Sequence, residues 1–368
     1  MNIPQSILDK RGSRLHNIPG NPICLIKQRI YHFFNKIHTN NKFKTFDELN
    51  EVVTVENNFD LLCIPKNHPA RSKSDTYYVD EDHVLMTHTS AHQNDLLTSG
   101  ERQFLVSGSV FRKDEIDRFH YPVFHQMEGV VIINDDMDPE QELKSTLSKL
   151  VEFLFPNKQY RFNTDYFPFT INSYEVEVLL QLNGGEEKWV EILGSGVIHP
   201  DILTHNKIEQ NGFAFGLGLE RLAMIFYSIP DIRLFWSTNV NFIKQFENHN
   251  YLDDITFIPY PKIPSIYKDI SFWLNTTNVT NIIDTNFEWT LQNDFYDIVR
   301  DVIENVENVE LIDKFYHPKK QLYSHCWRIV ISPNNEESNP GKFNDICNKQ
   351  MEKIKCELID KLQLECRM

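Results

Sequence analysis

The 368 residues of this chain are enough for two domains with separate cores, and 41% hydrophobic with 24% charged residues is the composition of a folded protein. A net charge of −15 argues against broad nucleic-acid binding over the whole surface, so any RNA contact must use local basic patches. No apolar run approaches the roughly 20 residues of a membrane span, and the six cysteines show no zinc-site or disulfide-framework spacing.

Residues 1–45 are predicted to form a basic N-terminal extension that ends in a helix. Residues 1–50 carry eight Lys or Arg and three Asp or Glu. Ile26 and Ile30 recur at helical spacing in the segment ICLIKQRIYHFF. Asp9 interrupts the Arg- and Ser-rich pattern of a targeting peptide, so no presequence is evident in this sequence.

Residues 46–246 are dominated by short β-strands. Four segments show strand patterning between turn residues: 103–111, 123–133, 174–182 and 188–198. One helix is predicted among them, in the stretch PEQELKSTLSKLVEFLF, because its leucines fall on one face. Strands without regular crossover helices favour a mainly antiparallel sheet with flanking helices, which is an α+β fold.

The last third of the chain is predicted to form a second domain. Residues 247–264 are polar and then proline-rich, and residues 247–258 are predicted to form an interdomain linker. Residues 259–368 follow the order strand, helix, strand, strand, helix, strand. This βαββαβ order is that of the ferredoxin-like arrangement, which by itself indicates no function.

The segment GFAFGLGLERLAMIFYS (212–228) combines a glycine-rich strand with a helix. Glycine in a strand leaves room where a ligand or another backbone comes close. Arg221 lies in the first turn of the predicted helix, where a guanidinium group suits a phosphate. The alternative is a tightly packed strand–helix junction with a surface arginine.

The segment VSGSVFRKDEIDRFHYPVFHQMEGVVI (106–132) gathers several chemical groups around one loop. Arg112 follows one strand, and Phe124, Gln126 and Glu128 alternate onto one face of the next. A cation, a ring, an amide and a carboxylate can together bind a phosphate, stack on a base and hold an ammonium group. The alternative is a hairpin with a solvated, charged turn.

Together these two segments resemble motifs 2 and 3 of class II aminoacyl-tRNA ligases. Further segments resemble phenylalanine–tRNA ligases, namely HPARSKSDTYY, DHVLMTHTSAHQNDLL, FHQMEG, DYFPFT and WVEILGSGVIHP. In the last third, KDISFWL, NDFYDIVRDV, VELIDKFYHPK and SHCWRI resemble the anticodon-binding domain of the organellar, single-chain form. The resemblance extends from about residue 14 to residue 330.

The resemblance implies an enzyme that activates L-phenylalanine with ATP and Mg²⁺ and transfers it to the 3′ end of tRNA(Phe). It implies a monomer without membrane association in the mitochondrial matrix, with the plastid stroma as the alternative. It leaves no segment of this sequence for a separate editing domain. An apolar pocket excludes an added hydroxyl group by only about 10²-fold, so tyrosine errors are expected to persist.

The resemblance also implies roles for individual residues. Arg112 and Arg221 would hold the α- and γ-phosphates of ATP, and Phe124 would stack on adenine. The remaining ATP-binding residues would be Phe119, His120, Tyr121 and Gly218. The amino-acid site would comprise His88, Ser90, Ala91, His92, Gln93, Gln126, Glu128, Phe167, Phe169, Ala214, Phe215 and Gly216. Glu191 would face the substrate or a Mg²⁺ ion, which prefers carboxylate oxygens.

For RNA binding we predict contributions from both ends of the chain. Residues 259–368 carry 13 Lys or Arg against 17 Asp or Glu, so the basic residues 1–50 are expected to supply much of the backbone attraction. A local patch is predicted at Lys314, Lys319, Lys320 and Arg328. The motifs argue against three other identities, namely a class II ligase for histidine or lysine, a non-catalytic synthetase-like RNA-binding protein, and the α-type subunit of a heterotetramer.

Overall fold

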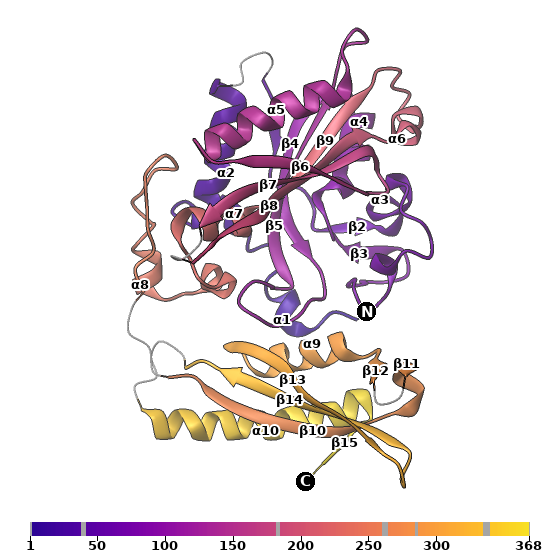
Figure 1. The fold of residues 1–368 in the computed structure, drawn as a ribbon, viewed down its shortest axis with the longest axis vertical. Coiled ribbons are helices and arrows are strands. Elements are labelled where there is room, and N and C mark those ends of the chain that lie inside the picture. Colours follow the sequence, from indigo (N-terminus) through magenta and orange to yellow (C-terminus); the bar gives the residue numbers. More distant parts are fainter. Residues whose placement is uncertain are drawn as a thin grey trace.

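The computed structural model describes residues 2–37, 42–181, 185–259, 264–283, 286–333 and 339–367. These residues form a large body that ends near residue 259 and a small body that begins near residue 264 (Figure 1). The N-terminal end lies near the junction of the two bodies, and the C-terminal end lies on the far side of the small one. Among the described helices, none is long and apolar enough to cross a membrane.

A seven-stranded sheet forms the centre of the large body, in the order β1-β4-β5-β9-β8-β7-β6. All its pairings are antiparallel except that of β1 with β4. Its strands are β1 (Lys44–Phe46), β4 (Gln103–Phe111), β5 (Val123–Ile132), β6 (Tyr160–Asp165), β7 (Thr170–Gln181), β8 (Glu187–Ile198) and β9 (Gly212–Gly218). The predicted α+β class with an antiparallel sheet is confirmed.

Helices cover both faces of this sheet (Figure 1). One core lies under α2 (Pro22–His32), α5 (Pro139–Leu154) and α7 (Leu219–Tyr227). The opposite core contains residues of α4 (Gln93–Thr98) and α6 (Pro200–His205) and lies beside α3 (Val55–Asn58). The other regular elements of the large body are α1 (Gln5–Leu8), β2 (Val52–Thr54), β3 (His83–Leu85) and α8 (Val240–Ile243).

The segment predicted as an N-terminal extension contributes to the core of the large body. Helix α2 buries Ile23, Ile26 and Ile30 in the core that it shares with α5 and α7. On the same helix, the ammonium group of Lys27 lies 2.7 Å from the carboxylate of Asp47. The segment is therefore basic in composition but packed in place.

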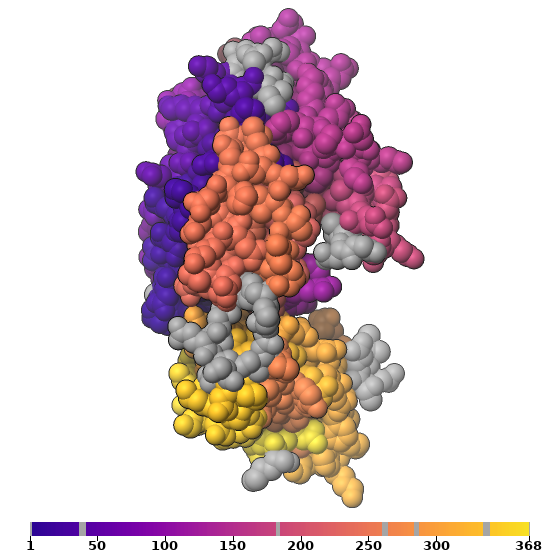
Figure 2. Space-filling view, turned by 90° about the vertical axis from the view of Figure 1, so that its left-hand side faces the viewer, coloured from indigo at the N-terminus to yellow at the C-terminus, as the bar shows by residue number. Residues whose placement is uncertain are grey.

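The predicted linker, residues 247–258, is also packed on the large body, although it lacks helices and strands. Ile255 and Phe257 are buried in the core under α7. The backbone N–H of Phe257 donates to the carbonyl of Tyr227 at 2.7 Å. The linker and the residues just before it, in orange, cover one face of the large body above the small body (Figure 2). The proline-rich stretch PYPKIP extends from here into residues 260–263, which lie outside the described part of the chain.

The small body contains a four-stranded antiparallel sheet in the order β13-β14-β10-β15. Its elements are β10 (Ile266–Leu274), β11 (Val279–Ile283), β12 (Asn286–Trp289), α9 (Gln292–Val302), β13 (Val306–His317), β14 (Leu322–Ile331), α10 (Pro340–Leu362) and β15 (Glu365–Cys366). Both helices pack on one face around Phe272, Phe295 and Trp327. The predicted βαββαβ order is present, with the hairpin β11–β12 as an unpredicted addition.

The two bodies meet through a polar contact between α9 and the loop that follows β4. The ammonium group of Lys113 lies 2.9 Å from the carboxylate of Asp294 and 3.4 Å from that of Asp297. The hydroxyl group of Tyr77 donates to Asp297 at 2.9 Å. Burial raises the pKa of Asp297 even though Arg300 and Lys113 lower it. The small body therefore touches the same loop that carries Arg112.

Candidate active site

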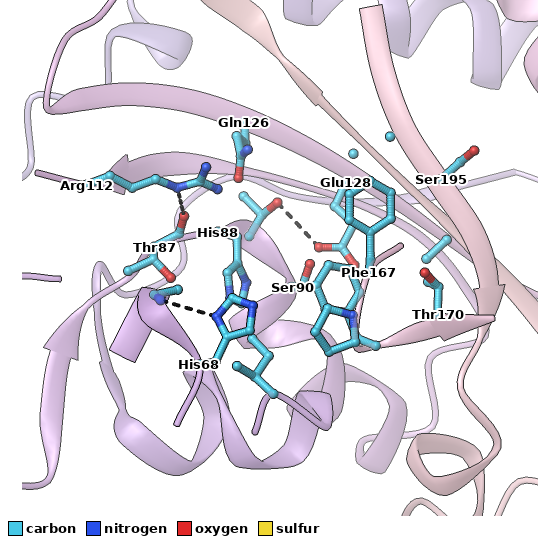
Figure 3. Close-up of a pocket in the computed structure, with 18 of the residues that line it drawn as sticks. His68, Thr87, His88, Ser90, Arg112, Gln126, Glu128, Phe167, Thr170 and Ser195 are labelled. Carbon is cyan, nitrogen blue, oxygen red and sulfur yellow. Dashed lines mark hydrogen bonds between the residues drawn. The ribbon is translucent and has the colours of Figure 1, made fainter. Parts of the chain in front are cut away.

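Two adjoining cavities lie over strands β5, β7, β8 and β9 of the large sheet. Their volumes are about 720 Å³ and about 670 Å³. The residues that line both cavities are Arg112, Asp114, Gln126, Glu191 and Gly216. Figure 3 shows the first cavity, with Arg112 and Gln126 on one side of the view and Thr170 and Ser195 on the other. The predicted site residues can therefore be sorted by the cavity that each one lines.

Strand β5 presents Phe124, Gln126 and Glu128 on one face, as the alternation predicted. Gln126 pairs in register with Gly218 of β9, and Glu128 pairs with Gly216. Because these two glycines lack side chains, the polar groups of β5 face open space.

The three glycines of β9 have different roles. A Cβ atom at Gly216 or Gly218 would meet its nearest neighbour only at 4.0 Å, so both positions border free volume. A Cβ atom at Gly212 would come within 2.6 Å of the carbonyl oxygen of Val131. Gly212 is therefore required by packing, whereas Gly216 and Gly218 form the floor of the cavities. Gly212 fits the interpretation as a tightly packed junction, whereas Gly216 and Gly218 fit the interpretation in which glycine leaves room for a ligand.

The two predicted phosphate-binding arginines line the second cavity. The Nε–H group of Arg112 donates to the carbonyl of Thr87 at 2.7 Å, and its guanidinium carbon lies 5.3 Å from the ring centre of Phe124. Arg221, in the first turn of α7, lies 2.8 Å from the carboxylate of Glu191. The other predicted ATP-binding residues that line this cavity are Phe119, His120, Tyr121, Phe124 and Gly218.

Asp117 orders the loop at the mouth of the second cavity. Its carboxylate accepts from the backbone N–H groups of Phe119 and His120 at 2.7 Å each, and it lies 2.9 Å from the imidazole Nδ1 of His120. Burial lowers the pKa of His120, but the hydrogen bond to Asp117 and nearby carboxylates outweigh burial and raise it above its ordinary value. The loop can therefore present a cation beside the cavity.

The polar end of the first cavity is formed by Glu128 with Thr89 and Ser90. Glu128 is only 4% exposed, and the hydroxyl group of Thr89 donates to it at 3.4 Å. Burial raises the pKa of Glu128 to about 7, against the opposing effect of hydrogen bonds from Ser90 and Thr89. A buried carboxylate with few partners favours a cationic ligand such as an α-ammonium group.

The apolar end of the first cavity is formed by the segment between β6 and β7. The rings of Phe167 and Phe169 lie 5.9 Å apart and nearly parallel, at 15°. A Cβ atom at Gly194 would meet the Phe167 ring at 2.9 Å, so glycine at this position on β8 makes room for that ring. Ala214 also lines this cavity. The end is therefore shaped for a planar apolar group.

Several predicted residues support the site from outside or from its edge. Ala91, His92 and Gln93 are buried but line neither cavity, and the His92 imidazole hydrogen-bonds with the carbonyl of Asn50. Phe215 borders the first cavity, yet its ring stacks at 5.4 Å on Phe34 in the core under α2, α5 and α7. These side chains hold the turn and the strand that carry the contacting groups.

His88 lines the first cavity next to Phe169, with 6.0 Å between the ring centres. Burial and the charge of Arg112 lower the pKa of His88 to about 3. The imidazole is therefore neutral near pH 7, and it cannot add a second positive charge beside the guanidinium group.

Two carboxylates of the β7–β8 pair face the region where the cavities join. Glu191 lines both cavities and Glu175 lines the first. Burial raises the pKa of Glu175, and the charges of Glu191 and Asp165 raise it further. A divalent cation would relieve this repulsion, and Mg²⁺ prefers such oxygen ligands. The described residues hold another cluster of potential ligands on the loop, formed by Glu115, Asp117 and His120.

The sequence prediction missed some residues that line the cavities. These are chiefly Thr87, Thr89, Lys113, Asp114, Arg118, Thr170, Glu175 and Ser195. Glu175 alternates with Glu177 in YEVEVLL, and that signal was available. The role of Thr87 lies in its backbone carbonyl, for which its side-chain identity gives no signal.

A mainly antiparallel sheet with two glycines and two arginines around one cavity is the arrangement of a class II aminoacyl-tRNA synthetase. The family model described as tRNA synthetases class II core domain (F) matches residues 11–246. The chain is 40% identical to Phenylalanine--tRNA ligase, chloroplastic/mitochondrial, of Arabidopsis thaliana over 100% of this chain and 82% of that protein. It is 42% identical to Phenylalanine--tRNA ligase, mitochondrial, of Mus musculus over 89% of this chain and 78% of that protein.

Two further similar proteins match only about two thirds of this chain. The Phenylalanine--tRNA ligase alpha subunit of Hamiltonella defensa is 40% identical over 64% of this chain and 70% of that protein. The crystal structure of pyrrolysyl-tRNA synthetase from Desulfitobacterium hafniense has a TM-score of 0.45 at 13% identity, over 60% of this chain and 74% of that chain. Because the mitochondrial relatives match beyond the core domain, the chain belongs to the single-chain, mitochondrial type of phenylalanine–tRNA ligase.

Proposed function

We propose that this chain activates L-phenylalanine with ATP and transfers the phenylalanyl group to tRNA(Phe) in mitochondrial translation. The observation that carries this proposal is the junction of the two cavities at Arg112. One cavity ends in a phenylalanine pair and a buried carboxylate, and the other contains Arg221 and Phe124. The names of the full-length relatives support both the substrate and the compartment.

The first step needs alignment and charge stabilisation but no nucleophilic side chain. A carboxylate oxygen of phenylalanine attacks the α-phosphorus of ATP, forming the adenylate, while the bond to the β-phosphate oxygen breaks and pyrophosphate leaves. Arg112 at the junction would neutralise charge on the α-phosphate, and Arg221 would hold the γ-phosphate. Glu128 would fix the ammonium group. Glu191 and Glu175 would hold Mg²⁺, whose charge would offset that of the triphosphate.

In the second step a hydroxyl group of the terminal tRNA ribose attacks the carbonyl carbon of the adenylate. The ester bond to tRNA forms, the mixed anhydride bond breaks, and AMP leaves with the electron pair. His88 has too low a pKa to accept the hydroxyl proton efficiently. We therefore assign His88 to positioning, and the phosphate oxygens of the adenylate remain as the nearby proton acceptor.

A direct test is ATP–pyrophosphate exchange with the purified chain, in which phenylalanine, tyrosine and histidine are compared. Exchange should depend on phenylalanine, with tyrosine weaker by about 10²-fold because the ring pocket is apolar. Exchange that histidine supports better than phenylalanine, or no exchange with any of the three, would refute the proposal.

We also propose that the chain does not hydrolyse mischarged Tyr-tRNA(Phe). The two cavities described above are both assigned to synthesis. Incubating purified Tyr-tRNA(Phe) with the enzyme should release tyrosine no faster than in buffer. Rapid, enzyme-dependent deacylation would show an editing activity.

The predicted monomeric state is tested separately by light scattering, which should give a mass near 43.5 kDa.

For tRNA binding we propose the open sheet face of the small body. Trp273 lies 6.5 Å from Phe315 and 6.0 Å from His317, measured between ring centres. Cations cover this cluster, since Arg367 lies 4.8 Å and Lys320 lies 5.6 Å from the Trp273 ring. Phe315 is exposed, and Trp273 and His317 are half-buried. Partly exposed rings beside cations favour unpaired nucleotides, whose bases stack and whose phosphates are anionic. We call these five residues the stacking cluster.

Three of the four residues of the predicted basic patch have different surroundings. Lys320 belongs to the stacking cluster, but Lys314 donates to the carbonyl of Phe287 and lies over that ring. Arg328 forms two hydrogen bonds of 2.8 Å with Asp269, so much of its charge is compensated within the protein. A guanidinium group that already has a carboxylate partner attracts phosphate less strongly.

The contribution of the basic N-terminal segment to tRNA binding stays a proposal. Ile7 and Leu15 are buried, so deleting residues 1–20 would disturb the fold as well as the charge. Replacing Arg11 and Arg14 by glutamine is the cleaner test. The affinity for tRNA should fall and its salt dependence should flatten, and unchanged affinity at every salt concentration would exclude the segment.

A further inference from the structure

A buried acidic side chain lies at the point where β9 turns into α7. Glu220 is 2% exposed, and both its carboxylate oxygens contact one residue of β5, His125, which is 0% exposed. One oxygen accepts from the backbone N–H of His125 at 2.7 Å. The other lies 2.7 Å from the imidazole Nδ1. The backbone N–H and the imidazole of one residue thus contact both oxygens of one carboxylate.

The neighbours of this pair in the sequence are residues of the ATP cavity. His125 follows Phe124, the residue assigned to adenine, and Glu220 precedes Arg221, the residue assigned to the γ-phosphate. Phe124 and Arg221 lie far apart in the chain, the first on β5 and the second on α7. A two-point hydrogen bond between their neighbours fixes the position of β5 against the start of α7.

The imidazole of His125 is also held on its other sides. His16 lies 5.1 Å away and Trp236 lies 6.0 Å away, measured between ring centres. Trp236 in turn stacks at 5.9 Å on Tyr121 of the loop that borders the ATP cavity. The ring therefore has little freedom to follow if the carboxylate is lost. Removing one partner of a buried charge-assisted hydrogen bond leaves the other unsatisfied.

We propose that Glu220 and His125 are positioning residues for ATP, which set the separation between the adenine-stacking ring and the γ-phosphate guanidinium group. This inference rests on the proposed function of the second cavity. Phenylalanine binding depends on side chains in the other cavity, so the pair should affect ATP more than phenylalanine. A purely structural pair would instead lower stability without distinguishing the two substrates.

The test compares four variants by ATP–pyrophosphate exchange and thermal unfolding. Glu220→Gln keeps the shape but offers one acceptor where two donors face it. His125→Phe keeps a ring without the donor, and His125→Asn keeps a donor near the Nδ1 position without the ring. Asp47→Asn is the matched control, because it removes another carboxylate hydrogen-bonded to a buried partner, Lys27, and lines neither cavity.

We expect Glu220→Gln and His125→Phe to raise the KM for ATP by about tenfold, the equivalent of one charge-assisted hydrogen bond. The KM for phenylalanine should change by less than about twofold, and His125→Asn should recover part of the loss. Asp47→Asn should lower the melting temperature without a change in either KM.

Equal changes in both KM values, or an unchanged KM for ATP in folded Glu220→Gln and His125→Phe, would overturn the inference. If Glu220→Gln does not fold, the two His125 variants decide the question, since only the proposal predicts that Asn outperforms Phe for ATP. Exchange by the unmodified chain is measured in the same assay. A failure of the proposed function would appear there, and a failure of this inference would appear only in the variants.

Discussion

At the scale of single residues, the role proposed for Glu128 makes two opposing demands. Its burial in the cavity favours the neutral form, yet binding of an ammonium group would require the ionised form. Its pKa of about 7 results from burial opposed by the hydrogen bonds from Ser90 and Thr89. In the proposed complex an arriving ammonium group would stabilise the charged form, so substrate binding and ionisation would be coupled.

This coupling predicts opposite pH effects on binding and on stability. A carboxyl group with a raised folded-state pKa stabilises the fold below its ordinary value of 4.5, and this contribution is lost as the pH rises through about 7. The KM for phenylalanine should therefore rise as the pH falls below about 7, while this group's contribution to the unfolding free energy increases.

Exchange kinetics across this range test the effect, with Glu128→Gln as the comparison. The variant should have a KM for phenylalanine raised by roughly 10- to 100-fold and no pH dependence from this group. If wild type and variant show the same pH profile, Glu128 is not the ammonium partner.

The glycines of β9 give a second prediction at this scale. A methyl group at Gly216 would touch no protein atom closer than 4.0 Å, so Gly216→Ala should fold with nearly unchanged stability. The methyl group would enter the floor shared by both cavities, so catalytic activity should fall by at least about tenfold.

Gly212→Ala is the matched control, because its methyl group would meet the Val131 carbonyl at 2.6 Å. That variant should lose stability, by about 1–3 kcal/mol of overpacking, with activity retained in the folded fraction. Thermal unfolding together with exchange kinetics separates the two effects. The reverse pattern would show that Gly216 is a packing glycine.

Period-two alternation was sufficient to place Phe124, Gln126 and Glu128 on one face, because a strand allows only two directions. The short turn Thr89–His92 has no such regularity. Whether Ser90 or His92 points into the cavity depends on what packs beneath the turn, and the sequence alone does not contain that information.

At the scale of elements, the amphipathic segments were predictable and the polar ones were not. β4 has its predicted bounds, 103–111, because apolar residues and flanking turn residues agree there. The hairpin β11–β12 was missed, since its Asn- and Thr-rich sequence resembles a loop. α2 was found, but its basic charge suggested an extension, although its apolar face packs in the core.

The contact between α9 and the loop after β4 carries a prediction at this scale. Lys113→Met would remove the cation that faces Asp294 and Asp297, leaving the more deeply buried Asp297 with fewer partners. Breaking a buried pair in this way costs about 3–5 kcal/mol. The small body should separate more readily from the large one.

Small-angle scattering and limited proteolysis near residue 260 should show a larger radius of gyration and faster cleavage. Lys66→Met is the control, because Lys66 forms a salt bridge with Asp60 but its side chain is 80% exposed. Equal behaviour of the two variants would mean that the α9 contact does not hold the bodies together.

At the scale of the whole molecule, a net charge of −15 must coexist with binding of a polyanion. Long-range attraction cannot supply the affinity of such a protein, so short-range stacking must contribute a large share. The stacking cluster supplies partly exposed rings and cations on the sheet face opposite α9 and α10. If this cluster binds RNA as proposed, the surface is located by rings beside cations rather than by the number of lysines and arginines along the small body.

Trp273→Ala should therefore weaken tRNA binding by roughly 10- to 100-fold, the equivalent of about 1–3 kcal/mol for one stacked base. Trp273→Phe should retain most of the affinity, because a ring remains. Neither variant should alter phenylalanine-dependent exchange, which requires no tRNA. Trp189→Ala is the control, since Trp189 packs 4.2 Å from an arginine on the large body. If both alanine variants bind tRNA equally well, the nucleotides bind elsewhere on the molecule.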